Sequence, residues 1–358
     1  MVHEAGGKFR MEDITLTDPL PDEVLIEVHA CGICHMDIEA RNMMQLPCVL
    51  GHEGAGTVVA AGEEVADYQP GDRVILTYGF CGHCGQCRES RPYFCDKGWE
   101  LTFGGLRLDG STTMYDDNDK PINGAFFQQS SFARHAITPA RSLVRIADEV
   151  PWHVAAALPC GFLTGAGTAL NVLEVDSTSS LLISGVGAVG IGAVVAAKMA
   201  GCKKIIAVDI RDNRLELARE FGATEVINAD QTDLDRWIKA ELPNGASHAL
   251  DTTGNKNAFA STIDCLATGG HMAYAILPAP MEDFEFKPFK LFVKCATFSA
   301  VSFGSAVADA LLSRLLEWWS VGEFPIESLI ATFSFEDIND AVDAAKSGEV
   351  IKPVLLME

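Results

Sequence analysis

The sequence lacks long apolar runs and has no secretory start. Its longest apolar runs, such as residues 193–197, are far too short to cross a bilayer. The first eight residues also lack the charged and then apolar pattern of a secretory signal. We therefore expect a soluble, cytoplasmic protein that has no membrane partner.

Basic residues are scarce. The chain has 27 Lys and Arg residues against 49 Asp and Glu residues, which gives a formal net charge of -22. Nucleic acids and anionic lipids are bound by clustered Lys and Arg that neutralise phosphates, so we expect no nucleic acid partner. We interpret the excess of acid as a solvated surface.

Enough apolar material is present for more than one core. The chain has 358 residues, of which 48% are hydrophobic, and this length favours two domains. It also contains 11 cysteines. Without an export signal, cysteines are more often metal ligands and buried apolar residues than disulfide partners.

Four cysteines lie close together in a C-x2-C-x2-C-x7-C pattern. They are Cys81, Cys84, Cys87 and Cys95. Four thiolates at this spacing suit one tetrahedral zinc ion, and a closed shell of four sulfurs leaves no position for water. A chance cluster of core cysteines is the alternative, which Gly82 and Gly85 disfavour because they fit a tight ligand loop. His83 receives no metal role, since the shell is already complete.

Residues 31–53 combine a thiol, an imidazole and carboxylates in one short stretch that contains Gly32, Pro47 and Gly51. Such turn residues allow close backbone approach, and we interpret the stretch as half of a catalytic metal site. On both sides, short alternating strands joined by Gly and Pro turns predict a small β-rich barrel.

From about residue 158 the pattern changes to alternating strands and helices. Residues 181–184 and 204–209 are compact apolar strands, and residues 187–200 between them have the composition of a helix. Further strand and helix patterns follow through residue 277. This alternation predicts a doubly wound parallel sheet.

The turn between the first of these strands and its helix is a G-x-G-x-x-G match, formed by Gly185, Gly187 and Gly190. Asp209 follows at the end of the next strand, 19 residues past Gly190. The combination predicts dinucleotide binding, with the pyrophosphate at the helix N-terminus and the ribose hydroxyls at Asp209. A carboxylate there favours NAD over NADP, although Arg211 nearby leaves room for NADP. Alternatively, Asp209 merely caps a strand.

The C-terminal part has one amphipathic helix, residues 305–321, and two closing strands that we expect to return to the first domain. The predicted boundaries are 1–160 for the catalytic domain, 161–300 for the NAD-binding domain and 301–358 for the returning segment.

Along nearly its whole length the chain resembles the zinc-dependent medium-chain alcohol dehydrogenase family. The resemblance lies in the 31–34 and 51–56 motifs, the four-cysteine lobe, residues 158–167 and the dinucleotide fingerprint. It implies an α/β fold with a Rossmann domain and a β-rich GroES-like catalytic domain. The loop before Phe126 and the segment 161–167 look most like the branch acting on benzyl, aryl and terpenoid alcohols. A homodimer or homotetramer is also implied.

The resemblance also implies a catalytic zinc bound by Cys34, His52 and Cys160, with a fourth position open. Asp37 resembles the carboxylate that orients the histidine ligand, and Glu53 resembles a conditional fourth ligand. Judged alone, Cys160 would be a small buried apolar residue, and Asp37 and Glu53 would be polar loop residues. With the four-cysteine lobe, two zinc ions per chain are implied.

Further positions are implied to contact NAD. His35 resembles a cationic contact to the pyrophosphate, Arg214 a residue near the adenosine ribose, and Lys352 a basic residue near the phosphates. Thr164 resembles the residue that approaches the nicotinamide, and Ala275 to Leu277 the backbone that holds its carboxamide. Judged alone, His35, Arg214 and Lys352 are ordinary surface residues. Thr77 and Phe126 align with substrate-pocket positions.

By this resemblance the chain would interconvert a primary alcohol and its aldehyde, with zinc as Lewis acid and NAD as hydride acceptor. Met36 departs from the pattern, because the family ordinarily has Ser or Thr there to pass on the alcohol proton. A thioether is only a weak acceptor and cannot relay a proton. The proton could leave by zinc-bound water or Glu53, or by Glu39, or the substrate could be an imine or activated alkene. A catalytically idle NAD-binding protein is a further alternative.

Overall fold

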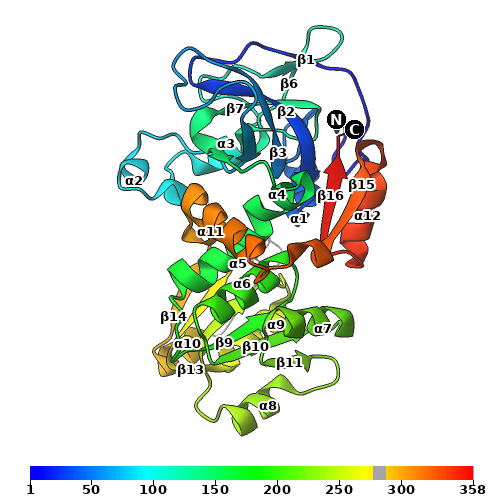
Figure 1. Ribbon diagram of the computed structural model, residues 1–358. Coiled ribbons are helices and arrows are strands. Elements are labelled where there is room, and N and C mark those ends of the chain that lie inside the picture. Colours follow the sequence, from blue (N-terminus) through cyan, green and yellow to red (C-terminus); the bar gives the residue numbers. More distant parts are fainter. Residues whose placement is uncertain (277–287, 358) are drawn as a thin grey trace. The chain divides into compact units, whose positions relative to one another are not determined.

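The computed structural model describes residues 1–276 and 288–357. The chain forms two compact units (Figure 1). The first contains Met1–Cys160, Val307–Trp319 and Pro325–Glu358, and the second contains Gly161–Ala306 and Ser320–Phe324. The first segment of the first unit thus ends at Cys160, the last residue of the catalytic domain in our predicted boundaries.

The first unit is built on a seven-stranded sheet, and a small sheet of β1 (Thr15–Leu16), β5 (Met114–Tyr115) and β6 (Pro121–Ile122) accompanies it. In spatial order the main strands are β15 (Ile330–Ser334), β16 (Lys352–Leu356), β2 (Glu23–Gly32), β3 (Gly54–Ala61), β4 (Arg73–Leu76) and β8 (Leu143–Arg145), and β7 (His135–Pro139) pairs with β2. Along β2, the alternate residues Val24, Ile26 and Val28 are buried, as expected for a strand with one core face. The C-terminal β16 pairs antiparallel with β2, so the tail returns as predicted.

Helices complete the first unit. They are α1 (His35–Met43), α2 (Gly85–Arg88), α3 (Gly98–Phe103), α4 (Trp152–Ala157), α11 (Ala308–Ser320) and α12 (Ile338–Ser347). The region after residue 98 contains α3 and the strands β5 and β6. These elements have six, two and two residues, which is too short for a periodic pattern to reveal.

A helical stretch, Trp152–Val172, carries the chain from the first unit into the second. It is long and apolar enough to cross a membrane, but 78% of its most apolar window is buried within the protein. We therefore interpret it as a core helix. The stretch includes two π-helical turns, Leu158–Phe162 and Thr168–Val172, on either side of α5 (Leu163–Gly167). Turns of this kind are frequent at functional sites, and the first contains Cys160.

The second unit has a six-stranded sheet whose neighbouring strands all pair in parallel. In spatial order the strands are β11 (Glu225–Asn228), β10 (Lys204–Asp209), β9 (Ser180–Ser184), β12 (Ala246–Asp251), β13 (Leu266–Tyr274) and β14 (Thr297–Ala300). The strand order reverses between β9 and β12, and in such sheets ligands bind beyond the carboxyl ends of the strands at this point. The predicted doubly wound sheet is confirmed.

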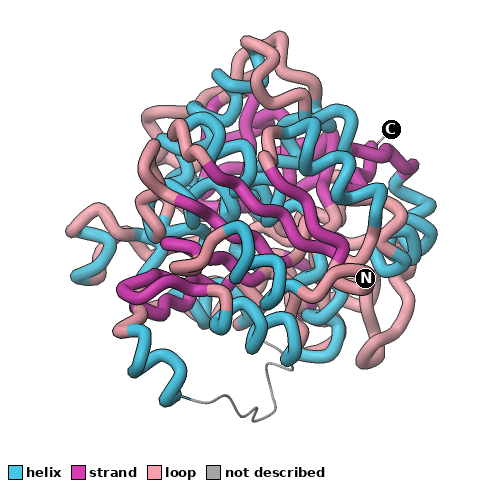
Figure 2. Tube along the Cα trace, turned by 90° about the horizontal axis from the view of Figure 1, so that it is seen from below, coloured by secondary structure: helices cyan, strands magenta, loops and turns pink. Residues whose placement is uncertain are grey.

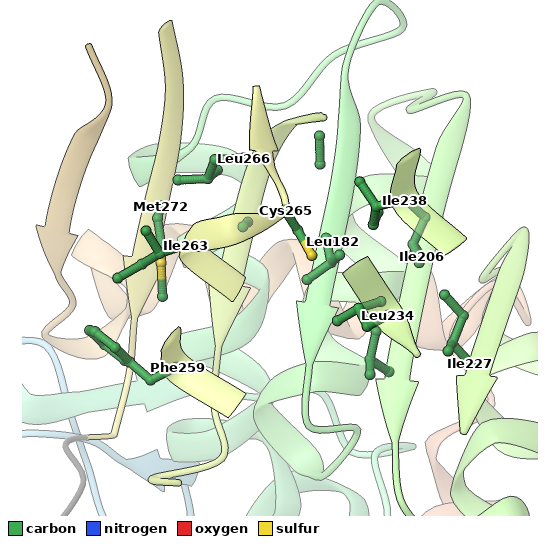
Figure 3. Packing of buried hydrophobic residues seen from close by; sticks show 13 residues of the cluster. Leu182, Ile206, Ile227, Leu234, Ile238, Phe259, Ile263, Cys265, Leu266 and Met272 are labelled. Atoms are coloured by element: carbon green, nitrogen blue, oxygen red, sulfur yellow. The ribbon is translucent and has the colours of Figure 1, made fainter. Parts of the chain in front are cut away.

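Helices accompany the parallel strands (Figure 2). They are α6 (Ala188–Met199), α7 (Asp212–Phe221), α8 (Leu234–Glu241), α9 (Lys256–Asp264) and α10 (Pro288–Lys294). One core cluster joins Leu234 and Ile263 of α8 and α9 to Leu182, Ile206 and Met272 of the sheet (Figure 3). The neighbouring residues of these strands point to the opposite face, and Leu181, Ile183 and Ile205 there are also buried, so both sheet faces are covered.

The return to the first unit begins later than the predicted residue 301. Val301 still belongs to the second unit, because its backbone N–H donates to the carbonyl of Tyr274. The side chain of Asn171 likewise donates to the carbonyls of Gly304 and Ser305 at 3.3 and 3.2 Å. These bonds keep the segment before Val307 with the second unit.

Replacing Gly165 with Ala should destabilise the second unit. An added Cβ would lie 1.8 Å from the carbonyl oxygen of Val189, where α5 and α6 pack backbone against backbone. Overpacking of this kind costs about 1–3 kcal/mol, so we expect a lower urea midpoint by circular dichroism. The control is Gly98→Ala, whose Cβ meets no atom of the described residues within 4 Å. Equal midpoints for the two variants would contradict this packing.

Candidate metal centres and dinucleotide site

Asp37 organises the stretch that we interpreted as half of a metal site. Cys34 is the N-cap of α1, and its backbone N–H donates to Oδ2 of Asp37 at 2.9 Å. Oδ1 accepts the N–H of Gly51 at 3.1 Å and lies 2.9 Å from Nδ1 of His52. Because a carboxylate only accepts hydrogen bonds, Nδ1 of His52 carries a proton, and Nε2 is the ring nitrogen left to bind a metal once it has no proton of its own.

The structure brings Cys34, His52, Glu53 and Cys160 together, with one ligand atom of each within 4.8 Å of the others. The two sulfurs are 3.7 Å apart, and Nε2 of His52 lies 3.3 Å from Sγ of Cys160. Two sulfurs bound to one tetrahedral zinc at about 2.3 Å would be about 3.8 Å apart. The donor set and its spacing therefore fit one zinc ion with three protein ligands.

Electrostatics favour a thiolate at this cluster. The hydrogen bond from Cys160, against the opposing effect of burial, holds the pKa of Cys34 well below its usual range, and the same bond raises the pKa of Cys160. Burial opposes the charged form of His52, but the neighbouring Asp37 carboxylate raises its pKa. The lowered pKa favours the thiolate form of Cys34, which is the form that binds metal.

Glu53 forms a buried ion pair behind the cluster. Nζ of Lys352 lies 2.8 and 2.7 Å from the two carboxylate oxygens, and the side chains are 2% and 0% exposed. Burial raises the pKa of Glu53 to about 7, although Lys352 opposes this shift. Our expectation for Lys352 is therefore corrected: its ammonium is buried against Glu53 in β16 and is not presented to phosphates. The signal in the sequence is a single lysine inside the apolar run 350–356.

Two phenylalanines enclose the ring of His52. Phe127 stacks on it with centroids 4.4 Å apart, and Phe126 meets it edge-on at 5.5 Å. Phe126 is fully buried, and we had assigned Phe127 no site role. Thr77 is also buried, and its hydroxyl donates to the carbonyl of Ser142 at 2.9 Å. The hydroxyl hydrogen of Thr77 is therefore not available to a substrate.

The four cysteines of the lobe, Cys81, Cys84, Cys87 and Cys95, form the second cluster, again with sulfurs within 4.8 Å of one another. Three sulfur–sulfur distances are 3.9 Å (Cys81–Cys87), 3.4 Å (Cys84–Cys87) and 4.0 Å (Cys84–Cys95). A set of four soft thiolates at this spacing suits tetrahedral zinc. His83 lies outside the cluster, with Nδ1 2.8 Å from the carbonyl oxygen of Cys81.

The dinucleotide fingerprint has the backbone that its glycines predict. Gly185 has a φ of +90°, and a Cβ on Gly190 would lie 2.1 Å from the carbonyl oxygen of Gly185. A Cβ on Gly187, the N-cap of α6, would meet no atom of the described residues within 4 Å. The backbone N–H groups at this helix start are therefore open to an anion, and the site fits a pyrophosphate.

Asp209 lies at the end of β10 and is 9% exposed. Its Oδ1 accepts the N–H groups of Ile210 and Arg211, and its Oδ2 accepts the N–H of Val186 in the fingerprint loop at 2.8 Å. It thus caps the strand, as the alternative interpretation held, and it also contacts the loop. Nη1 of Arg214 is 4.0 Å from the same carboxylate, so both residues lie on the ribose side of the predicted site.

His35 and Met36 occupy the first turn of α1. The side chain of His35 is 65% exposed, and its Nε2 is 3.5 Å from Oε1 of Glu39. Met36 is half-buried. The Glu39 carboxylate therefore faces His35 along the exposed side of the helix.

The remaining predicted cofactor positions belong to the second unit. Thr164 is half-buried in α5, and its carbonyl accepts the hydroxyl of Thr168 at 2.6 Å. The N–H of Ala275 donates to the carbonyl of Asp251 at 3.0 Å, which places Ala275 at the carboxyl end of β12, beside the reversal of strand order. Leu277 lies outside the described residues.

Comparison with known proteins gives two family matches in one chain. Residues 20–148 match the alcohol dehydrogenase GroES-like domain, and residues 188–318 match the zinc-binding dehydrogenase family. The first range contains Cys34, His52 and Glu53 of the first cluster and the whole four-cysteine lobe. The second range begins at the helix of the dinucleotide fingerprint, and Cys160 lies between the two ranges.

Full-length relatives are similar over almost the whole chain. The geraniol dehydrogenase of Castellaniella defragrans is 38% identical over 99% of this chain and 96% of its own. Alcohol dehydrogenase 1 of Zea mays is 30% identical over 99% of this chain and 96% of its own. The crystal structure of benzyl alcohol dehydrogenase from Acinetobacter calcoaceticus has a TM-score of 0.94 at 35% identity and covers 99% of this chain and 98% of that chain.

Replacing Lys352 with Met should strongly destabilise the protein, because Glu53 would remain buried without its counter-charge. Breaking a buried pair in this way costs about 3–5 kcal/mol. The double variant Lys352→Met with Glu53→Gln removes both charges and should recover most of that loss. Urea unfolding of wild type, both single variants and the double variant measures the coupling. Additive losses would show that the two side chains do not interact.

Proposed function

We propose that this chain, which belongs to the zinc-binding alcohol dehydrogenase family, interconverts a primary alcohol and its aldehyde with zinc and NAD. Aromatic, allylic or terpenoid alcohols are the proposed substrates. The observation that carries the proposal is the spacing of Cys34, His52 and Cys160, which suits one tetrahedral ion and leaves a fourth position. The likeness to a geraniol dehydrogenase and a benzyl alcohol dehydrogenase supports the substrate class.

In this proposal Cys34, His52 and Cys160 hold the zinc. Zinc would supply Lewis acidity, which polarises an alcohol oxygen and lowers its pKa. Asp37 fixes the imidazole of His52 so that Nε2 faces the two sulfurs. The buried pair of Glu53 and Lys352 adds no net charge beside the two thiols.

The second unit would bind NAD, the hydride acceptor. The N–H groups at the start of α6 hold the pyrophosphate, and the carboxylate of Asp209 accepts hydrogen bonds from the ribose hydroxyls. The same negative charge repels a 2′-phosphate, which favours NAD over NADP. Arg211, whose N–H is bonded to Asp209, is the group that could offset this repulsion.

Because Met36 has no hydroxyl, the proton released by the alcohol must leave the site by a route other than a side-chain hydroxyl at this position. Of the two carboxylates considered, Glu53 has an oxygen within 4.8 Å of the zinc-binding atoms, whereas Glu39 faces His35. This geometry favours Glu53, or water, as the proton acceptor over Glu39. A second candidate function is the reduction of an imine or activated alkene, which the same methionine favours if the proton for that reduction does not pass through the family's hydroxyl relay.

A kinetic panel tests the proposed function. Benzyl, cinnamyl, terpenoid and aliphatic primary alcohols are incubated with the protein and either NAD or NADP, and reduced cofactor is followed by its absorbance. We expect turnover with aromatic or allylic alcohols and a higher kcat/KM with NAD. Oxidation of NADH by an imine or enone, with no alcohol turnover, would favour the second candidate. Binding of NAD without any turnover would identify an idle protein.

Metal analysis tests the two proposed zinc sites separately. We expect about two zinc ions per chain in the purified protein and one in Cys160→Ser, because that variant loses a ligand of the first cluster. The control is Cys295→Ser, since Cys295 is an exposed free cysteine outside both clusters and its loss should leave both ions bound. One ion in the wild type, unchanged in Cys160→Ser, would refute the first site.

A further inference from the structure

A strained and buried segment, Phe126–Ser131, lies against the proposed zinc centre. All six residues are buried, and Phe127, Gln128 and Ser130 have φ values of +52°, +59° and +49°. Non-glycine residues rarely adopt this left-handed conformation, and each instance costs free energy that surrounding contacts must offset. Such clusters of strain mark places where a side chain is held in a required position.

The side chain of Gln129, which is 0% exposed, makes four hydrogen bonds within this segment and its surroundings. Nε2 donates to the carbonyls of His52 at 3.0 Å and Thr77 at 3.1 Å. Oε1 accepts the N–H of Gly54 at 3.2 Å and the hydroxyl of Ser131 at 2.9 Å. Carbonyl oxygens cannot donate and a backbone N–H cannot accept, so His52, Thr77 and Gly54 fix which amide atom is the nitrogen. The hydrogen-bonding capacity of the amide is filled.

Two of these bonds hold the residue Glu53 from both sides. The carbonyl of His52 belongs to the peptide group before Glu53, and the N–H of Gly54 belongs to the peptide group after it. The amide of Gln129 therefore pairs with this stretch as a neighbouring strand would. A Cβ on Gly54 would lie 2.7 Å from Cβ of Ser131, so the glycine allows the close approach.

We propose that Gln129 is a positioning residue for the proposed zinc centre. By fixing the backbone of His52 and Glu53, it sets where the imidazole and the carboxylate stand relative to Cys34 and Cys160. Asp37 fixes the tautomer of the imidazole and Phe127 packs on its ring, and Gln129 fixes its backbone. This inference rests on the proposed function, since it needs a metal at that cluster.

The neighbouring Gln128 provides a matched control. It is also buried, at 5% exposed, and it lies next to Gln129 in the strained segment, although its own φ is +59° and that of Gln129 is -142°. Its Nε2 donates to the carbonyls of Leu106 at 3.1 Å and of Leu101 and Ala125 at 3.4 Å each. These bonds do not involve His52 or Gly54, and Leu101 packs against the four-cysteine cluster. Gln128 is thus a buried glutamine of the same loop that holds a different part of the unit.

The test compares Gln129→Met with Gln128→Met in the full-length protein loaded with two zinc ions. Methionine keeps the length of the side chain and removes its hydrogen bonds. Zinc is withdrawn by a chromogenic chelator, which measures the affinity of each site, and cobalt substituted at the first site reports its geometry by visible absorption. We expect Gln129→Met to weaken the first site about tenfold and to change the cobalt spectrum, with the four-cysteine site unaltered. Gln128→Met should leave the first site within twofold of wild type.

Two results would overturn the proposal. One is a first-site affinity of Gln129→Met within twofold of wild type with an unchanged cobalt spectrum. The other is equal weakening of the first site by both variants, which indicates general loosening of the loop. If Gln129→Met does not fold, Ser131→Ala removes one of the four bonds of the amide, together with the 3.2 Å contact between the Ser131 hydroxyl and Sγ of Cys31, and should still weaken the first site selectively. A wild type that binds zinc at the four cysteines alone would instead refute the proposed function.

Discussion

The proposed catalytic site depends on the hydrogen bonds that the carboxylate of Asp37 accepts. This carboxylate is fully buried and bonds to the backbone of Cys34, the backbone of Gly51 and the ring of His52. These three groups come from the start of α1 and from the loop before β3, so one side chain fixes the relative position of two ligand-bearing segments. A buried carboxylate is stable only when its oxygens accept hydrogen bonds, and here both do. The same bonds that make its burial tolerable also direct Nε2 of His52 toward the sulfurs.

The C-terminal strand completes this site from the far end of the chain. Lys352 of β16 reaches Glu53 across 299 residues of sequence, and β16 pairs with β2 just before Cys34. Without Lys352, the carboxylate of Glu53 would stand unpaired beside two thiols that must lose their protons to bind metal. The returning segment therefore contributes the ammonium group of Lys352, which is the counter-charge of Glu53.

Local spacing in the sequence predicted the four-cysteine cluster and the glycine fingerprint, because each of these sites is built within one short stretch. The parallel sheet was also predictable from its alternating pattern. Cys160 was placed at the metal only through the family resemblance, since its partner Cys34 lies 126 residues away. The roles of Lys352, Phe127 and Gln129 could not be predicted. A lone lysine in an apolar run and two glutamines between aromatic and serine residues indicate buried polar groups, but a sequence does not show which carbonyl or carboxylate will meet them.

The surroundings of the first cluster combine fixed polar groups with apolar ones, and this combination bears on Met36. Phe126 and Phe127 cover the ring of His52, and Met36 adds a thioether two residues after Cys34 in place of a hydroxyl. The polar contacts around the cluster are made to the proposed ligands themselves. Asp37 contacts the ring of His52, Gln129 contacts the backbone of His52, and Lys352 contacts the carboxylate of Glu53. A low-polarity environment strengthens each of these electrostatic interactions. The loss of the hydroxyl at residue 36 therefore leaves intact the buried hydrogen bonds from Asp37 and Gln129 that position these ligands.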